Sequence, residues 1–174
     1  AQLGVPLVSD EIYDGLVFDG GSAPSALAAS EDVFVLDGFS KRYAMTGFRL
    51  GYVIAPSGAM RALQSLAQNL FISVSSFAQR AGVAALEHGD ATTAAMRESY
   101  GARRALLIDG LSRLGLEVPV IPRGAFYVFA DARRFGSDST ALASKILEQA
   151  HVAVTPGIDF GEAGEGFLRF SCTA

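Results

Sequence analysis

The stretch Gly38-Phe39-Ser40-Lys41-Arg42-Tyr43-Ala44-Met45-Thr46-Gly47-Phe48-Arg49-Leu50-Gly51 lies between two short apolar runs. The run at residues 33–36 precedes it, and the run at residues 49–55, which ends before Pro56, overlaps its last residues. Short apolar runs bounded by turn residues are typical of buried strands in a parallel sheet. We therefore expect Lys41 to follow directly after a buried strand.

A third apolar run, at residues 6–8, ends in Ser9-Asp10 and predicts another buried strand of the same sheet. The carboxyl ends of parallel strands meet at one edge of a sheet, where α/β proteins bind their ligands. Asp10 and Lys41 are therefore expected at the same edge. Taken alone, each also has a plainer interpretation, with Lys41 as a solvated surface lysine and Asp10 as a turn residue that ends a strand.

Beyond Pro56 the apolar pattern has a helical period. Ser57 is predicted to cap a first helix, and a second helix is predicted over residues 76–87. His88-Gly89 is a stop signal for that second helix, because glycine accepts the left-handed turn. Asp90 is predicted to cap a long third helix around residues 91–114, which Gly115 ends.

The remaining chain predicts an α+β domain, with a strand over residues 124–130, a helix over 140–150 and a last strand over 167–171. With the long helix as the bridge, we expect two domains, residues 1–94 and 95–174. The chain enters an apolar strand pattern at once and begins without methionine. We interpret it as a fragment of a longer protein.

Composition argues against several classes of protein. The 174 residues are 50% hydrophobic, which suits a globular fold, and the net charge of -4 offers no footprint for a nucleic acid. With Cys172 as the single cysteine and two histidines, no metal site is predicted. No apolar run reaches the length of about 18 residues that a membrane span needs. We expect a protein of the reducing cytoplasm, without nucleic-acid or membrane partners.

Residues 38–51 resemble the lysine-attachment signature of the class I/II aminotransferases, the aspartate-aminotransferase-like family of fold type I. The aromatic residue, Ser40, Lys41 and the closing Gly-x-Arg-x-Gly all fall in register. The resemblance implies that Lys41 holds pyridoxal 5'-phosphate (PLP) as a Schiff base, and that Ser40 and Arg49 bind its phosphate. Gly38 is a departure, since many relatives carry a serine at this position, although glycine is tolerated there.

Residues 10–13, Asp-Glu-Ile-Tyr, resemble the family's Asp-x-x-Tyr element. The resemblance implies that Asp10 pairs with the pyridine nitrogen of the cofactor and that the Tyr13 hydroxyl bonds the ring oxygen. A carboxylate beside the ring nitrogen favours the protonated form, which withdraws electrons from the substrate. These two residues are therefore expected to be cofactor-binding.

Arg169-Phe170-Ser171 resembles the family's Arg-x-Ser element, and residues 154–161 resemble its small-domain turn. The resemblance implies that Arg169 binds the substrate α-carboxylate, which matches the two parallel donors of a guanidinium. A strand arginine that merely faces outward is the plainer alternative.

The implied fold is the C-terminal half of a fold-type I PLP-dependent transferase: an α/β large domain with a mostly parallel sheet and helices, followed by an α+β small domain. The implied enzyme is a homodimeric aminotransferase acting on an amino acid and a 2-oxo acid, with Lys41 also as general base. This chain alone is expected to hold an incomplete site, because the family's glycine-rich phosphate loop has no match in it. Other PLP chemistry (β-lyase, decarboxylase, cyclopropane-forming synthase) and a PLP-binding domain of a transcription regulator stay open.

Overall fold

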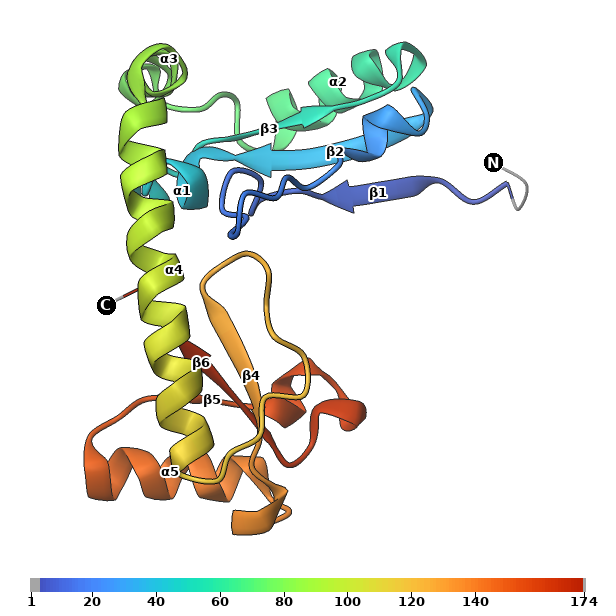
Figure 1. Ribbon diagram of the computed structural model, residues 1–174. Helices are drawn as coiled ribbons and strands as arrows, with labels where there is room; N and C mark the ends of the chain where they lie inside the picture. The colour runs from blue at the N-terminus through green and yellow to red at the C-terminus, as the bar shows by residue number, and fades with distance from the viewer. Residues whose placement is uncertain (1–3, 174) are drawn as a thin grey trace. The chain divides into compact units, whose positions relative to one another are not determined.

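The computed structural model describes residues 4–173 and divides into two compact units, Ala1–Arg97 and Glu98–Ala174, each of which is described by itself. Three strands of the first unit lie side by side in the order β1 (Leu7–Asp10), β2 (Val33–Gly38) and β3 (Gly51–Ile54) (Figure 1). β1 and β2 are parallel, with Asp10 beside Leu36. The fold is α/β, as expected, and the ends of β1 and β2 lie together.

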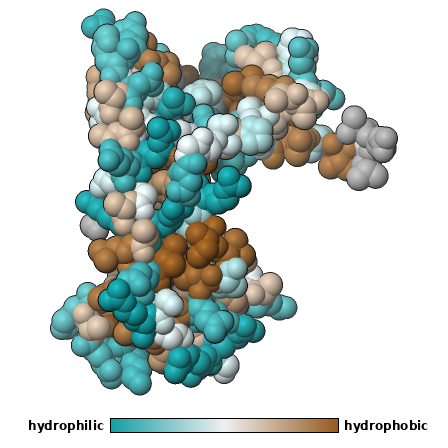
Figure 2. Space-filling model, in the orientation of Figure 1, coloured by the Kyte–Doolittle hydropathy of each residue, from teal (hydrophilic) through white to brown (hydrophobic). Residues whose placement is uncertain are grey.

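Two of these strands differ from the expectation of buried, parallel strands. β3 runs antiparallel to β2, because α1 (Phe39–Arg42) and the 3-10 turn η2 (Thr46–Phe48) turn the chain straight back, whereas a parallel pair needs a longer crossover. β2 is the buried strand, and the apolar side chains of β1 and β3 are largely exposed. Figure 2 shows apolar surface along this strand layer. Both exposed strands are edges of a sheet that has three strands among the described residues.

The first unit also contains α2 (Met60–Leu70) and α3 (Ser76–His88), and α4 (Asp90–Arg113) runs on into the second unit. The predicted cap at Ser57 is wrong: the 3-10 turn η3 (Ser57–Ala59) comes first, and Ala59 precedes α2 without a side-chain cap. Asp90 is the first residue of α4, where a carboxylate favours the helix dipole, and not the residue before it. Among the described residues, no helix combines the length and apolar character needed to cross a membrane.

Gly89 separates α3 from α4, but the predicted left-handed turn is wrong, because its φ and ψ are -80° and -11°. A Cβ atom at this position would lie 2.4 Å from the Ala85 carbonyl oxygen and 2.7 Å from the Tyr43 ring. Glycine is therefore required by the close approach of Tyr43 and not by the turn. The junction between the two helices packs directly against the segment that carries Lys41.

The second unit contains β4 (Tyr127–Asp131), α5 (Ser139–Ala150), β5 (Thr155–Pro156) and β6 (Phe167–Ser171). Its sheet has the order β4-β6-β5, and both pairs are antiparallel. β6 has the predicted bounds. β4 begins three residues later than predicted, at Tyr127, because Ala125 adopts a left-handed φ of 59°, which a strand cannot contain.

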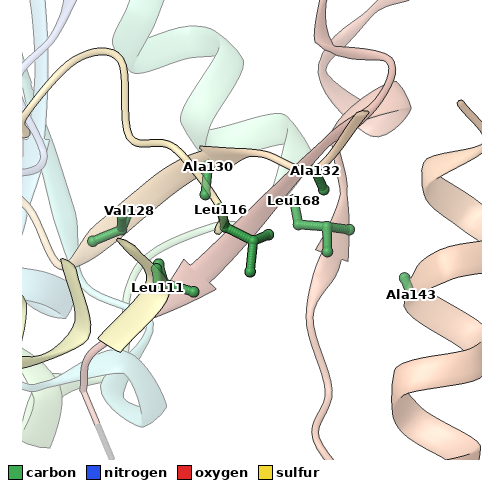
Figure 3. Close-up of a cluster of buried hydrophobic side chains, with 7 residues drawn as sticks. All are labelled: Leu111, Leu116, Val128, Ala130, Ala132, Ala143 and Leu168. Atoms are coloured by element: carbon green, nitrogen blue, oxygen red, sulfur yellow. The ribbon is translucent and has the colours of Figure 1, made fainter. Parts of the chain in front are cut away.

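The core of the second unit is a cluster of small and branched apolar side chains (Figure 3): Leu111, Leu116, Val128, Ala130, Ala132, Ala143 and Leu168. Gly115 ends α4 as predicted, with a φ of 80°. The Gly115 amide donates to the Ser112 carbonyl and the Leu116 amide to the Leu111 carbonyl, both at 2.9 Å. This is the Schellman arrangement, and it brings Leu116 onto Leu111 in the core.

We expect Gly89→Ala to lower the free energy of unfolding by about 1–3 kcal/mol, because the added methyl group meets a backbone oxygen and a packed ring. The measurement is urea denaturation. Gly110→Ala in α4 is the matched control: no atom lies within 4 Å of the new methyl group, so this change should be neutral or stabilise by up to about 1 kcal/mol. Equal, neutral results for both variants would contradict the packing argument.

Candidate active site

Asp10 is the last residue of β1, and Tyr13 lies in the tight turns that follow this strand. The Glu11 amide donates to the Leu36 carbonyl at 2.8 Å, which extends the pairing with β2 by one residue. Asp10 Oδ1 accepts from the Ile12 amide at 3.2 Å, and the Leu16 amide donates to the Tyr13 carbonyl at 3.0 Å. These bonds hold the segment that carries Asp10 and Tyr13 at the carboxyl end of β1.

The Glu11 side chain joins this segment to residues 25–26 by hydrogen bonds. Its carboxylate accepts from Ser9 Oγ at 3.0 Å, from Ser25 Oγ at 3.2 Å and from the Ala26 amide at 2.8 Å, at the start of the 3-10 turn η1 (Ala26–Ala28). The pKa of Glu11 is lowered, chiefly by the hydrogen bond from the Ala26 amide. Glu11 is thus a structural carboxylate, whereas its neighbour Asp10 is exposed at the strand end.

Lys41 lies in α1, directly after β2, and is partly buried. Phe39, two residues earlier, is buried, and its amide donates to the Leu50 carbonyl at 3.2 Å. α3 approaches this segment at Gly82, where a Cβ atom would lie 2.5 Å from Leu50 Cδ2 and 3.3 Å from the Phe39 ring. The turn that presents Lys41 is therefore packed onto a helix.

The structure supplies a physical reason for Gly38. Gly38 pairs with Gly51 across β2 and β3, and a Cβ atom on Gly38 would lie 3.0 Å from the Leu50 carbonyl oxygen and 3.3 Å from Ile12 Cδ1. Contacts this short require the neighbours to shift. Glycine thus lets the two strands and the turn after β1 meet closely beside Lys41.

Arg49 adopts the left-handed conformation at the end of η2, with φ 52° and ψ 47°. Its Nη1 donates to the Thr46 carbonyl at 2.9 Å, and the side chain is exposed. This conformation is uncommon for a residue other than glycine and costs of the order of 1 kcal/mol. Arg49 is thus held in the turn that leads into β3.

Arg169 lies in β6 of the second unit, opposite Phe129 of β4 and Thr155 of β5. Its guanidinium carbon lies 4.2 Å from the ring centre of Tyr127 and 4.7 Å from that of Phe160. Nη2 donates to Thr155 Oγ1 at 3.3 Å. The two rings and the hydroxyl hold the planar group in one orientation, unlike that of a freely solvated arginine.

A cavity of about 430 Å³ opens beside this arginine, within the second unit. It is lined by Val120, Pro122, Tyr127, Phe129, Phe160 and Arg169. Among these residues Arg169 carries the charge. Apolar walls around an oriented guanidinium form a site that can bind a carboxylate whose remainder is apolar.

All the predicted cofactor-binding residues belong to the first unit: Asp10, Tyr13, Ser40, Lys41 and Arg49. Asp10 ends β1 and Tyr13 follows it, Ser40 and Lys41 follow the end of the parallel strand β2, and Arg49 lies in the turn that leads into β3. An amine, a carboxylate, a phenol, a hydroxyl and a guanidinium are the groups that a pyridine aldehyde phosphate requires, so the set fits PLP chemically. Arg169, the predicted substrate residue, belongs to the second unit.

Sequence reasoning missed the residues that hold these groups in place. The rings of Tyr127 and Phe160 contact the Arg169 guanidinium, a role that the sequence analysis did not assign to either residue. In the register of β4 and β6, Phe129 lies opposite Arg169, and Tyr127 lies two residues before Phe129 in β4. Pairing the two predicted strands would have placed both aromatic side chains near Arg169. The pairing of Arg42 with Asp14 had no such signal, because Arg42 lies in α1 and Asp14 lies 28 residues earlier, in the turn after β1.

The α/β arrangement, with a parallel strand pair that ends near these residues, matches solved fold-type I aminotransferases. The sequence profile of the aminotransferase class I and II family matches residues 1–174, and the chain belongs to this family. Its members are PLP-dependent enzymes, as the resemblance of residues 38–51 implies.

Relatives from several organisms support this assignment. The chain is 43% identical over 170 residues to the valine–pyruvate aminotransferase of Mycobacterium tuberculosis. This match covers 96% of this chain and 44% of that protein. It is 39% identical to the aspartate/prephenate aminotransferase of Thermus thermophilus, over 95% of this chain and 43% of that protein. The crystal structure of the aromatic aminotransferase from Pyrococcus horikoshii matches with a TM-score of 0.93 and 34% identity, over 99% and 47% of the two chains. The chain thus spans less than half the length of these relatives.

Proposed function

We propose that the protein containing this chain is a PLP-dependent aminotransferase that moves an amino group between an L-amino acid and a 2-oxo acid. The observation that carries the proposal is the position of Lys41, on a packed turn at the carboxyl end of β2, beside the end of the parallel strand that carries Asp10. The relatives named above are aminotransferases with different substrates, which supports the reaction and leaves its substrates open.

Each cofactor-binding residue has a proposed role. When bound, PLP supplies an electron sink for bond changes at the substrate α-carbon. Lys41 Nζ anchors the cofactor covalently, and once released it acts as the base that moves the α-proton. The Asp10 carboxylate keeps a proton on the ring nitrogen, and the Tyr13 hydroxyl bonds the ring oxygen. Ser40 Oγ and the Arg49 guanidinium bind the phosphate.

Arg169 is proposed to bind the substrate α-carboxylate. Its contacts with the Tyr127 and Phe160 rings and with Thr155 Oγ1 hold the planar donor group that a carboxylate needs in one orientation. The apolar walls of the cavity weaken competition from water, which strengthens a charged hydrogen bond.

The wider assembly is also part of the proposal. Residues 1–94 would be the later part of a large domain and residues 95–174 the small domain, joined by α4. We further propose that the chain is the C-terminal half of a longer protein, which supplies the glycine-rich phosphate loop, forms a homodimer and works in the cytoplasm. The relatives are more than twice as long as the matched part, which supports the existence of a longer protein.

Lys41 and Lys145 are the two lysines of the chain, which gives a matched pair for a test. In the full-length protein, borohydride reduction followed by peptide mapping should label Lys41 with a pyridoxyl group. Lys41→Ala should lower glutamate formation from an amino acid and 2-oxoglutarate by about 10³-fold or more, because anchor and base are both lost. Lys145→Ala, on the exposed face of α5, should behave as wild type.

Two results would contradict the proposed reaction. Normal turnover in Lys41→Ala would exclude Lys41 as the base. Formation of pyruvate and ammonia without glutamate would indicate β-lyase chemistry at the same lysine.

For Arg169→Ala we expect the KM for the amino acid to rise about 10- to 100-fold, the range for a lost charge-assisted hydrogen bond, with a smaller change in kcat. Arg169→Lys keeps the charge but not the planar fork, and should lie between wild type and alanine. Arg134→Ala is the control, because that arginine is exposed in the 3-10 turn η4 (Arg133–Phe135). Steady-state kinetics with an unchanged KM in Arg169→Ala would contradict the assignment.

A further inference from the structure

One ion pair joins the two turns that carry the proposed cofactor-binding residues. Arg42 directly follows Lys41, and Asp14 directly follows Tyr13. Arg42 Nη1 donates to Asp14 Oδ2 at 3.3 Å, across 28 residues of sequence. The residue next to the proposed anchor is thus bound to the residue next to the proposed ring-oxygen ligand.

The side chain of Arg42 is packed along its length. A Cβ atom at Gly15 would lie 3.0 Å from Arg42 Cδ, so glycine is needed for the stem to cross the turn after Asp14. The guanidinium carbon lies 5.4 Å from the centre of the Tyr43 ring, and Nε is buried without a hydrogen-bond partner among residues 4–173. The side chain is 34% exposed. The head group therefore depends on Nη1 and Nη2 for its polar contacts.

The two carboxylates near Arg42 are unequal. Asp14 is 43% exposed and accepts a hydrogen bond, whereas Asp90 at the start of α4 is 87% exposed, with Oδ1 3.7 Å from Nη2. An exposed pair at such a distance contributes little, because water screens it. The orientation of the Arg42 side chain is therefore set by Asp14.

The backbone of Arg42 is held as well. Thr93 Oγ1 in α4 donates to the Arg42 carbonyl at 3.0 Å, and Thr93 is buried. Tyr43 packs against Gly89 at the start of the same helix. Arg42 is thus bonded through its backbone to α4 and through its guanidinium to the turn after β1.

We propose that Arg42 is a positioning residue, which through Asp14 sets the separation between Lys41 Nζ and the Tyr13 hydroxyl. The inference rests on the proposed function. A half-exposed ion pair adds little to overall stability, but a displacement of about 1 Å between reacting groups can cost up to about 10²-fold in rate. The pair should therefore affect chemistry more than folding.

The test uses the full-length protein with the variants Arg42→Met, Asp14→Asn and the double variant. We expect each single variant to lower kcat about tenfold, with little change in the KM for the amino acid. The double variant should be no slower than either single one, because both remove the same interaction. Asp90→Asn is the matched control and should remain close to wild type. Arg42→Lys, which can still reach Asp14, should recover part of the lost rate.

A second readout does not depend on turnover. The dissociation constant of PLP, measured by absorbance titration of the apo protein, should rise several-fold in Arg42→Met and Asp14→Asn but not in Asp90→Asn. The thermal midpoint should change little in the absence of cofactor. If Arg42→Met does not fold, Asp14→Asn decides, since it leaves the packing of Arg42 intact.

Additive effects of the two single variants, or a lower thermal midpoint with unchanged kcat and PLP affinity, would overturn the positioning role and leave Arg42 as a structural residue. Failure of the proposed function has a different signature. In that case the wild-type protein itself would not be labelled by borohydride at Lys41.

Discussion

The close packing of the turn after β2 against the helices of the first unit is the constraint on which the rest depends. The Phe39 and Leu50 side chains lie so close to Gly82 that a larger residue there would clash with them. The Tyr43 ring lies equally close to Gly89. Lys41 lies between these two contacts on α1. A flexible lysine side chain is useful for covalent catalysis only when its backbone is fixed, and the two glycines provide that fixation.

The sequence predicted those elements whose signals are local. Gly115 ends α4 in a left-handed turn and β6 has its predicted bounds, because capping chemistry and strand alternation act within a few residues. The direction of β3, the exposure of β1 and β3 and the conformation of Gly89 were predicted wrongly. The direction of β3 follows from the short link between β2 and β3, which is too short for a parallel crossover. The exposure of β1 and β3 and the conformation of Gly89 depend on partners distant in the sequence, such as the Tyr43 ring beside Gly89.

The candidate site likewise contains residues that the sequence predicted and residues that only the tertiary structure brings together. Lys41 and Asp10 were predicted at one sheet edge from the expected strands, and their roles and that of Arg169 were predicted from the family resemblance, because chemistry restricts which side chains can do their work. The groups that orient them were not found, since Asp14 meets Arg42 and Phe160 meets Arg169 only through the tertiary fold. The turn at residues 154–161 was noted as a resemblance, and it supplies both Thr155 and Phe160 to Arg169. Motifs thus identify reacting groups earlier than the residues that position them.

The most direct measurement is a crystal structure of the full-length protein grown with PLP. The account predicts continuous electron density between Lys41 Nζ and the aldehyde carbon of the cofactor, with an Asp10 carboxylate oxygen about 3 Å from the ring nitrogen. A cofactor attached elsewhere, or Lys41 directed to solvent with Asp10 far from the ring, would contradict it.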